Sequence, residues 1–362
     1  MDTSDPEITF DERGFCNHCR FYDEKLKGQF RNNEEGRKEL EDVIQKIKNE
    51  GKNKEYDCII GVSGGVDSSM TAYLVRKMGL RPLAIHLDNG WDAELAVSNI
   101  ERLLKKLDIN LYTYVLNWEE FKDLQLSFLR SSVANCEIPT DHAINAVLCR
   151  TALEKKIRYI IKGGNIATES ILPASWGYNA RDLKHLIAVH KKFGKVKLKT
   201  FPTFSVWRLA WHLLRKDLIY LPILNYVNYN KKEAKAFLEK EFGWRDYGGK
   251  HYESIYTRFF QGYYLPQKFG FDKRRAHLSS LICSGQITRE SALKEMDQHP
   301  YSDAKLSLED RDYVIKKFGL TEKEFERIIS SPPKSYKDYP NDEVFIQFFS
   351  SIYRFLKALL VR

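Results

Sequence analysis

Residues 34–162 alternate between two hydrophobic periods. Four apolar runs have the length and composition of buried strands: residues 56–62, 81–87, 110–116 and 158–162. Apolar positions at helical spacing predict helices around them: residues 34–49, 70–78, 91–107, from about 118, and 142–154. Strands that alternate with helices predict an α/β fold with a doubly wound, mainly parallel sheet.

The pattern changes after residue 170. Residues 171–230 lose the strand–helix alternation and become basic and aromatic, which is typical of a segment that covers a site, binds single-stranded RNA or a sugar ring, or is simply solvated. A helix is expected from its cap Asn230 to Gly243, and 307–310 and 321–324 have the spacing of capping boxes. The expected organisation is an N-terminal Cys-x-x-Cys segment, a nucleotide-binding domain, a substrate-binding and helical region, and a C-terminal amphipathic helix: residues 1–33, 34–170, 171–335 and 344–362.

The first strand of this pattern ends in a loop of small and polar residues: Ser63, Gly64, Gly65, Val66, Asp67, Ser68 and Ser69. Adjacent glycines let backbone amides converge on an anion where the next helix begins, and the serines add hydroxyl donors. No Gly-Lys-Ser/Thr follows, and the glycine spacing of dinucleotide-binding loops is absent. The loop therefore predicts a pyrophosphate pocket, as in an enzyme that cleaves ATP between the α and β phosphates.

Polar or glycine residues also follow two other expected strands: Asp88 and Asn89 after 81–87, Gly164 and Asn165 after 158–162. Ligands of such sheets bind beyond the carboxyl ends of the strands. Asp88 and Asn89 are therefore expected near ribose or adenine, and Gly164 and Asn165 are expected where a substrate approaches the backbone.

Three later pairs complete the expected site. Asp141 and His142 lie on the same rim as substrate contacts, although Asp141 is equally typical of a helix cap. Lys250 and His251, in the densest polar stretch, are expected to contact substrate. Lys273 and Arg274 would replace the missing lysine by neutralising the departing pyrophosphate, unless they begin a solvated helix.

The six cysteines are irregularly spaced, which favours thiols or a metal site over disulfides. Cys16 and Cys19 have the sequence spacing of two ligands of one tetrahedral zinc ion. Further ligands are expected from His18, His251 or Cys283. Two free thiols or a redox pair remain the alternative.

Lys and Arg (58) outnumber Asp and Glu (49), giving a net charge of +9 that favours anionic partners. No secretion signal or spanning run of apolar residues is visible, so a cytoplasmic location is expected. On a helix, the tail has one narrow polar face, made of Gln347, Ser350, Ser351, Arg354 and Lys357. Burial of the wide apolar face, on the protein itself or in a homodimer, is favoured over peripheral contact with the inner face of the membrane.

The loop at 63–69 resembles the PP-loop of the ATP pyrophosphatase superfamily, which has an adenine nucleotide alpha hydrolase-like fold. Together with 15–19, Pro-Thr-Asp-His at 139–142, and the blocks at 243–254 and 272–279, it resembles N-acetyl sugar amidotransferases of the WbpG and PseA type. The resemblance implies ATP-dependent conversion of an acetamido group on a bacterial surface-polysaccharide sugar, such as one of the LPS O-antigen, to an acetamidino group through an adenylated intermediate. It implies that the loop holds the ATP phosphates, with Asp67 binding Mg²⁺.

The resemblance further implies ammonia from a separate glutaminase with a cyclase-like subunit. An N-terminal glutaminase would need cysteine directly after the initiator Met, where this chain has Asp2. The alternative hypothesis is a PP-loop tRNA-modifying enzyme, although nucleic acid is not the expected partner. A third hypothesis is a non-enzymatic nucleotide sensor.

Overall fold

The computed structural model describes residues 1–249, 252–301 and 303–360, without the side chains of 353–360. Its centre is a five-stranded sheet in the order β3-β2-β1-β4-β5, and every pair of neighbouring strands is parallel. The strands are β1 (Cys58–Gly61), β2 (Pro82–Asp88), β3 (Asn110–Val115), β4 (Tyr159–Lys162) and β5 (Ile219–Pro222). The expected α/β fold with a doubly wound parallel sheet is confirmed.

Strand side chains alternate between two apolar layers. Ile59, Ile85 and Ile160 belong to the cluster that α5 (Trp118–Ser131), α6 (Ile138–Glu154) and α8 (Leu183–Phe193) complete. Ile60, Ala84 and Ile161 belong to the cluster completed by α2 (Glu34–Gly51), α3 (Val66–Lys77), α4 (Glu94–Leu107) and α10 (Lys231–Phe242). Because helices cover both faces of the sheet, the central strands have continuous apolar sequences instead of alternating apolar and polar residues.

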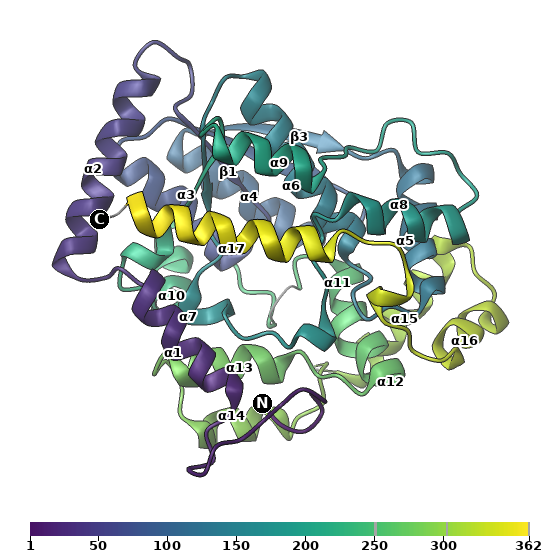
Figure 1. Ribbon diagram of the computed structural model, residues 1–362. Helices are drawn as coiled ribbons and strands as arrows, with labels where there is room; N and C mark the ends of the chain where they lie inside the picture. The colour runs from purple at the N-terminus through teal and green to yellow at the C-terminus, as the bar shows by residue number, and fades with distance from the viewer. Residues whose placement is uncertain (250–251, 302, 361–362) are drawn as a thin grey trace.

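The C-terminal part is helical and lies beyond one end of the sheet (Figure 1). It comprises α11 (Ile255–Phe259), a π-helical turn (Phe260–Tyr264), α12 (Leu265–Phe269), α13 (Arg274–Cys283), α14 (Arg289–Met296), α15 (Ala304–Phe318), α16 (Glu322–Ser330) and α17 (Glu343–Leu360). Near the N-terminus, α1 (Asn17–Gln29) lies beside α13, and α17 crosses the front of the view in Figure 1. Among the described helices, none has the length and apolar character needed to cross a bilayer.

The segment 171–230 differs from expectation, because it contains α8, α9 (Val206–Leu214) and then strand β5 of the main sheet. The strand–helix alternation therefore continues past residue 170. The sequence pattern does not reveal this alternation, because α9 carries apolar residues on two faces and β5 has only four residues.

The structure tests four predicted helix starts. Asn230 caps α10 by accepting from the Lys232 and Glu233 amides, and Thr321 forms a capping box with Glu324, both as predicted. The box predicted at 307–310 is wrong, because Asp303 caps α15 and Ser307 lies inside that helix. The cap role of Asp141 is also wrong, since α6 begins at Ile138 and places Asp141 in its first turn.

Candidate functional site

The loop after β1 has a backbone shape that only glycine adopts easily. Gly64 has φ +81°, and a Cβ placed there would lie 2.6 Å from the Ala96 carbonyl oxygen. Helix α3 begins two residues later at Val66, and its first-turn residues lie at the space beyond the sheet, where helix-start amides can bind an anion. The Ser68 hydroxyl donates to the Gly65 carbonyl oxygen (3.0 Å), which fixes the turn.

A cavity of about 930 Å³ opens in front of this loop. Four parts of the chain contribute its walls: the loop with Ser63, Gly65, Asp67 and Ser68; the segment after β4 with Gly163, Gly164 and Glu169; the start of α10 with Lys231, Lys232 and Lys235; and residues 244–300 with Glu253, Gln261, Lys273, Arg274 and His277. The volume is within the range of sites that enclose a small molecule. The cavity therefore lies beyond the carboxyl ends of β1 and β4, as expected for this type of sheet.

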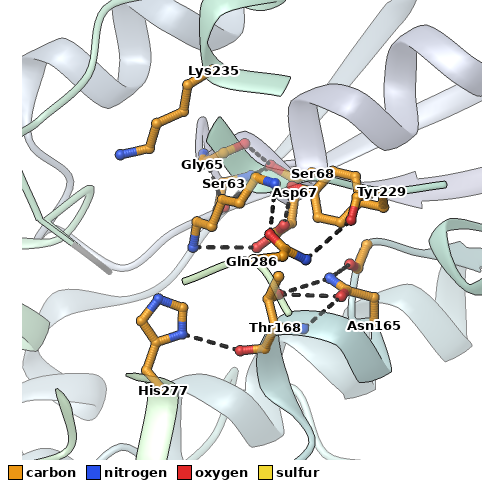
Figure 2. A network of polar contacts seen from close by, with 12 residues as sticks. Ser63, Gly65, Asp67, Ser68, Asn165, Thr168, Tyr229, Lys235, His277 and Gln286 are labelled. Atoms are coloured by element: carbon orange, nitrogen blue, oxygen red, sulfur yellow. Dashed lines mark hydrogen bonds and ion pairs between the residues drawn. The ribbon is translucent and has the colours of Figure 1, made fainter. Parts of the chain in front are cut away.

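Asp67 has two partners from the segment that leads into α10. The Tyr229 hydroxyl donates to one carboxylate oxygen, and the Lys231 ammonium lies 3.9 Å from the other. Burial, followed by the Asp67 charge, raises the pKa of Tyr229 above its ordinary value, so the hydroxyl remains a donor. Figure 2 shows the loop residues facing Tyr229, with Lys235 and His277 across the same opening. A carboxylate at a cavity wall with adjacent cations suits a site for a metal-bound phosphate.

The two cations predicted to replace the missing lysine both line the cavity, but their surroundings differ. Lys273 lies with its ammonium 5.3 Å from the centre of the Phe260 ring. The Arg274 guanidinium donates to Asp272 (2.7 Å) and to the carbonyl oxygens of Glu295 and Gln298 (both 3.0 Å). Arg274 therefore holds α13 to the end of α14, and Lys273 is the more available of the two to a ligand.

The cavity lining lacks five residues predicted at the phosphates or the nucleotide: Gly64, Ser69, Asp88, Asn89 and Asn165. Ser69 is 1% exposed on the inner side of α3, and within the described residues its hydroxyl has no hydrogen-bond partner. Asp88 accepts from the Gly90 amide at the end of β2 (2.8 Å). Asn165 is buried and caps the short helix α7 (Ile166–Glu169) by accepting from the Thr168 amide (3.0 Å). These side chains shape the rim rather than face its opening.

The predicted substrate contacts Asp141 and His142 also lie away from the cavity lining. His142 is 1% exposed, donates from Nδ1 to the Ala180 carbonyl oxygen (2.8 Å) and accepts from the Phe204 amide. Burial lowers its pKa, which keeps the ring neutral. Lys250 and His251 lie outside the described residues.

The sequence analysis missed the cations and the phenol that α10 and its approach bring to Asp67: Tyr229, Lys231 and Lys235. Glu253 and His277 were named only as parts of longer polar stretches, yet both line the cavity. Nδ1 of His277 donates to the Thr168 carbonyl oxygen (3.0 Å), which orients its ring. The lysine pair directly after the Asn230 cap was the available signal, because a helix start rich in lysine faces unfavourable dipole interactions unless an anion lies nearby.

The three cysteines predicted to bind zinc do come together at α1 and α13. The Cys16 and Cys19 sulfurs lie 3.4 Å apart, and Cys283 lies close enough to Cys19 to influence its pKa. Burial and then the Cys19 charge raise the pKa of Cys283 to about 12. His18 pairs with Asp5 instead (2.6 Å). Within the described residues, no group of three or more His, Cys, Asp or Glu side chains is arranged to hold a metal ion, so zinc is not supported.

The helices beyond the sheet match a known family. Residues 253–353 match the family described as LPS biosynthesis protein WbpG-like, C-terminal domain. We call this matched segment the WbpG-like domain. The resemblance to WbpG-type proteins is thereby confirmed, and the WbpG-like domain supplies Glu253, Lys273 and His277 to the cavity wall that faces the loop.

Two known proteins are similar to a shorter part of this chain. The chain is 33% identical over 87 residues to the tRNA-specific 2-thiouridylase MnmA of Vesicomyosocius okutanii, and 30% identical over 87 residues to that of Ruthia magnifica. Each match covers 22% of this chain, which spans about a quarter (24%) of either relative.

Among solved structures, the NH3-dependent NAD synthetase of Campylobacter jejuni in complex with the nitrate ion has 15% identity and a TM-score of 0.34, covering 79% of this chain and 97% of that one. The U34-tRNA thiolase NcsA of Methanococcus maripaludis with its 4Fe-4S cluster has 12% identity and a TM-score of 0.33, covering 74% and 86%. Activity does not follow from likeness at this level.

Proposed function

We propose that this protein is an ATP-dependent, AMP- and pyrophosphate-forming amidotransferase that converts the acetamido group of a bacterial surface-polysaccharide sugar to an acetamidino group. One observation carries the proposal: residues of the lysine-free Ser63–Ser69 loop at the start of α3 and residues of the WbpG-like domain line the same cavity. A phosphate-binding loop supplies the activating nucleotide, and the facing wall supplies room for a second substrate. Since ATP is a cytoplasmic metabolite, we place the reaction in the cytoplasm.

Different residues of the cavity would bind different parts of a triphosphate. The amides that begin α3, with the hydroxyls of Ser63 and Ser68, face the anion. Asp67 would hold Mg²⁺, which supplies charge neutralisation when bound. Lys231, Lys235 and Lys273 add positive charge from other parts of the cavity wall. A structural zinc is not part of this proposal.

The chemistry follows from the poor leaving ability of an amide oxygen. The acetamido oxygen attacks the α phosphorus, the bond from that phosphorus to the α–β bridging oxygen breaks, and pyrophosphate departs with the electron pair. Ammonia then adds to the imidoyl carbon and loses a proton, and AMP leaves with the former amide oxygen. The cations that surround the loop stabilise charge on both departing groups.

Purified protein is expected to release pyrophosphate and AMP, and no ADP, when it receives ATP, Mg²⁺, an acetamido sugar and an ammonium salt. Glutamine should not replace ammonium, because we propose that a separate glutaminase, acting with a cyclase-like subunit, delivers ammonia. Isotope-labelled ATP identifies the nucleotide products, and mass spectrometry of the sugar detects replacement of the carbonyl oxygen by nitrogen. A panel of acetamido sugars, free and nucleotide-linked, identifies the substrate.

Each arm of this assay can fail separately. ADP and phosphate as products would contradict the phosphate-loop assignment. Turnover with glutamine alone would contradict the separate ammonia source. Nucleotide binding with no pyrophosphate release under any substrate would assign the protein to nucleotide sensing instead of catalysis.

A PP-loop tRNA-modifying enzyme is a second candidate, favoured by the partial match to 2-thiouridylases and by the basic stretch at 184–199. It predicts tight tRNA binding whose affinity falls steeply as salt rises, since each neutralised phosphate releases counterions. Pyrophosphate release that depends on tRNA and sulfide, with none on acetamido sugars, would establish it in place of the sugar reaction.

Lys231→Met is expected to lower kcat for pyrophosphate release by about tenfold or more, because it removes a cation beside Asp67 at the cavity wall. Lys240→Met is the matched control: this exposed lysine lies near the other end of α10 and does not line the cavity. Its kcat should stay within about twofold of the parent. Equal loss in both variants would show that general positive charge, rather than the Lys231 position, matters.

A further inference from the structure

Helix α9 has apolar side chains on two opposite faces. Val206, Leu209 and Ala210 are buried in the protein. Trp207, Trp211 and Leu214 have 56%, 59% and 51% of their surface exposed, and their spacing places them on one face. An amphipathic surface helix normally carries polar residues there, so this second apolar face has no role in the protein's own core.

Helix α17 extends that exposed face. The Phe345 ring stacks on Trp207 with centroids 3.4 Å apart, which docks the first turns of α17 on α9. Val344 and Phe348, one turn apart, are 83% and 64% exposed, and Ile352 is 37% exposed. Together the six exposed side chains form what we call the α9–α17 apolar surface: Trp207, Trp211, Leu214, Val344, Phe348 and Ile352.

A strip of positive charge accompanies this surface. Residues 183–216 contain nine basic residues and no Asp or Glu, and all nine are exposed: Lys184, Lys191, Lys192, Lys195, Lys197, Lys199, Arg208, Arg215 and Lys216. Asp342 pairs with Lys184 (3.4 Å) and Asp217 with Arg215 (3.1 Å), which leaves the strip strongly basic. The Arg215 guanidinium also lies 5.5 Å from the Trp211 ring centre, so the charged and apolar groups adjoin.

We propose that the α9–α17 apolar surface rests on an anionic membrane, with the tryptophans and Phe348 in the lipid interface and the basic strip over the headgroups. This goes beyond the proposed function, whose chemistry needs no membrane. Tryptophan and aliphatic side chains beside lysine and arginine match the two layers of such an interface. A second copy of the chain fits less well, because a symmetric contact would bring the basic strip near itself. Single-stranded RNA could stack on the tryptophans but offers nothing to Leu214, Val344 and Ile352.

The test is co-sedimentation of the full chain with vesicles of phosphatidylcholine, alone or with about a third phosphatidylglycerol. Binding is expected to the anionic vesicles. The double variant Trp207→Ser/Trp211→Ser should lower the partition coefficient about tenfold or more. Leu293→Ser/Leu308→Ser, which removes two leucines that are 52% and 58% exposed on α14 and α15, is the matched control and should bind like the parent. Thermal unfolding of each variant checks that the fold is intact.

Charge-reversal variants in the same assay distinguish electrostatic attraction from insertion of the apolar side chains into the membrane. Lys191→Glu/Lys197→Glu/Lys199→Glu should weaken binding to anionic vesicles about a hundredfold, whereas Lys46→Glu/Lys240→Glu/Lys323→Glu changes the net charge equally and should weaken it far less. Full vesicle affinity in the tryptophan variant would overturn the proposal. So would binding to a single-stranded RNA homopolymer without vesicle binding, or a dimer that the tryptophan variant dissolves in the absence of lipid.

Discussion

Asp67→Asn is expected to lower kcat for pyrophosphate release by about a hundredfold to ten-thousandfold, because it removes the carboxylate proposed to hold Mg²⁺. The side chain lies in the first turn of α3, at the wall of the cavity, between Tyr229 and Lys231. An amide keeps the size of the side chain but provides no negative charge for the metal. Initial rates at saturating ATP and sugar measure the effect, with Mg²⁺ varied to detect a shift in its apparent affinity.

Tyr229→Phe is the matched control for Asp67. It removes the hydroxyl that donates to Asp67 and leaves the ring in the core, where Tyr229 is 5% exposed. Loss of one such hydrogen bond should change kcat by less than about tenfold. Retention of more than about a third of the parent rate in Asp67→Asn would be incompatible with a metal-binding role for the carboxylate.

Gly64→Ala is expected to abolish measurable ATP binding and to destabilise the protein by about 1–3 kcal/mol. At φ +81° an L side chain is strained, and the added Cβ would lie 2.6 Å from the Ala96 carbonyl oxygen, which belongs to α4 and cannot turn aside. The Gly64 carbonyl oxygen also accepts hydrogen bonds from Trp244 (2.8 Å) and Tyr247, so displacement of the loop would disturb a second cavity wall. Calorimetric titration with ATP and thermal unfolding measure the two effects.

Gly14→Ala is the control that distinguishes the effect of backbone strain from the effect of the close contact at Gly64. Gly14 has almost the same dihedral angle, φ +80°, but no atom lies within 4 Å of an added Cβ. This variant should lose about 1 kcal/mol of stability and bind ATP like the parent. Equal ATP affinity in Gly64→Ala and Gly14→Ala would mean that the close approach at Gly64 does not matter for nucleotide binding.

The sequence predicted the parts of the site whose geometry is local. Gly64 and Asp67 belong to one strand–loop–helix unit, so their spacing alone indicates an anion site at the start of α3. Gly164 lines the cavity because it ends β4, the strand next to β1 in the sheet. Both inferences need only the rule that parallel strands end at the same edge.

Inferences about isolated polar residues were less secure. His142 and Asn165 have the composition of site residues, but a histidine or asparagine can equally satisfy buried backbone groups. The structure gives His142 the Ala180 carbonyl oxygen and the Phe204 amide, and it makes Asn165 the cap of α7. Only the packing of α6 and of the residues around it distinguishes these roles.

The sequence by itself determined the parallel sheet, the order of its first four strands along the chain and the phosphate-type loop, because hydrophobic period and glycine position act within a few residues. Only the tertiary structure decided what faces that loop. Tyr229 lies 162 residues from Asp67 along the chain, yet its hydroxyl contacts the carboxylate, because α10 packs beside α3. The exposure of Trp207 was likewise decided by packing, since α9 has two apolar faces and only the fold determines which one it buries.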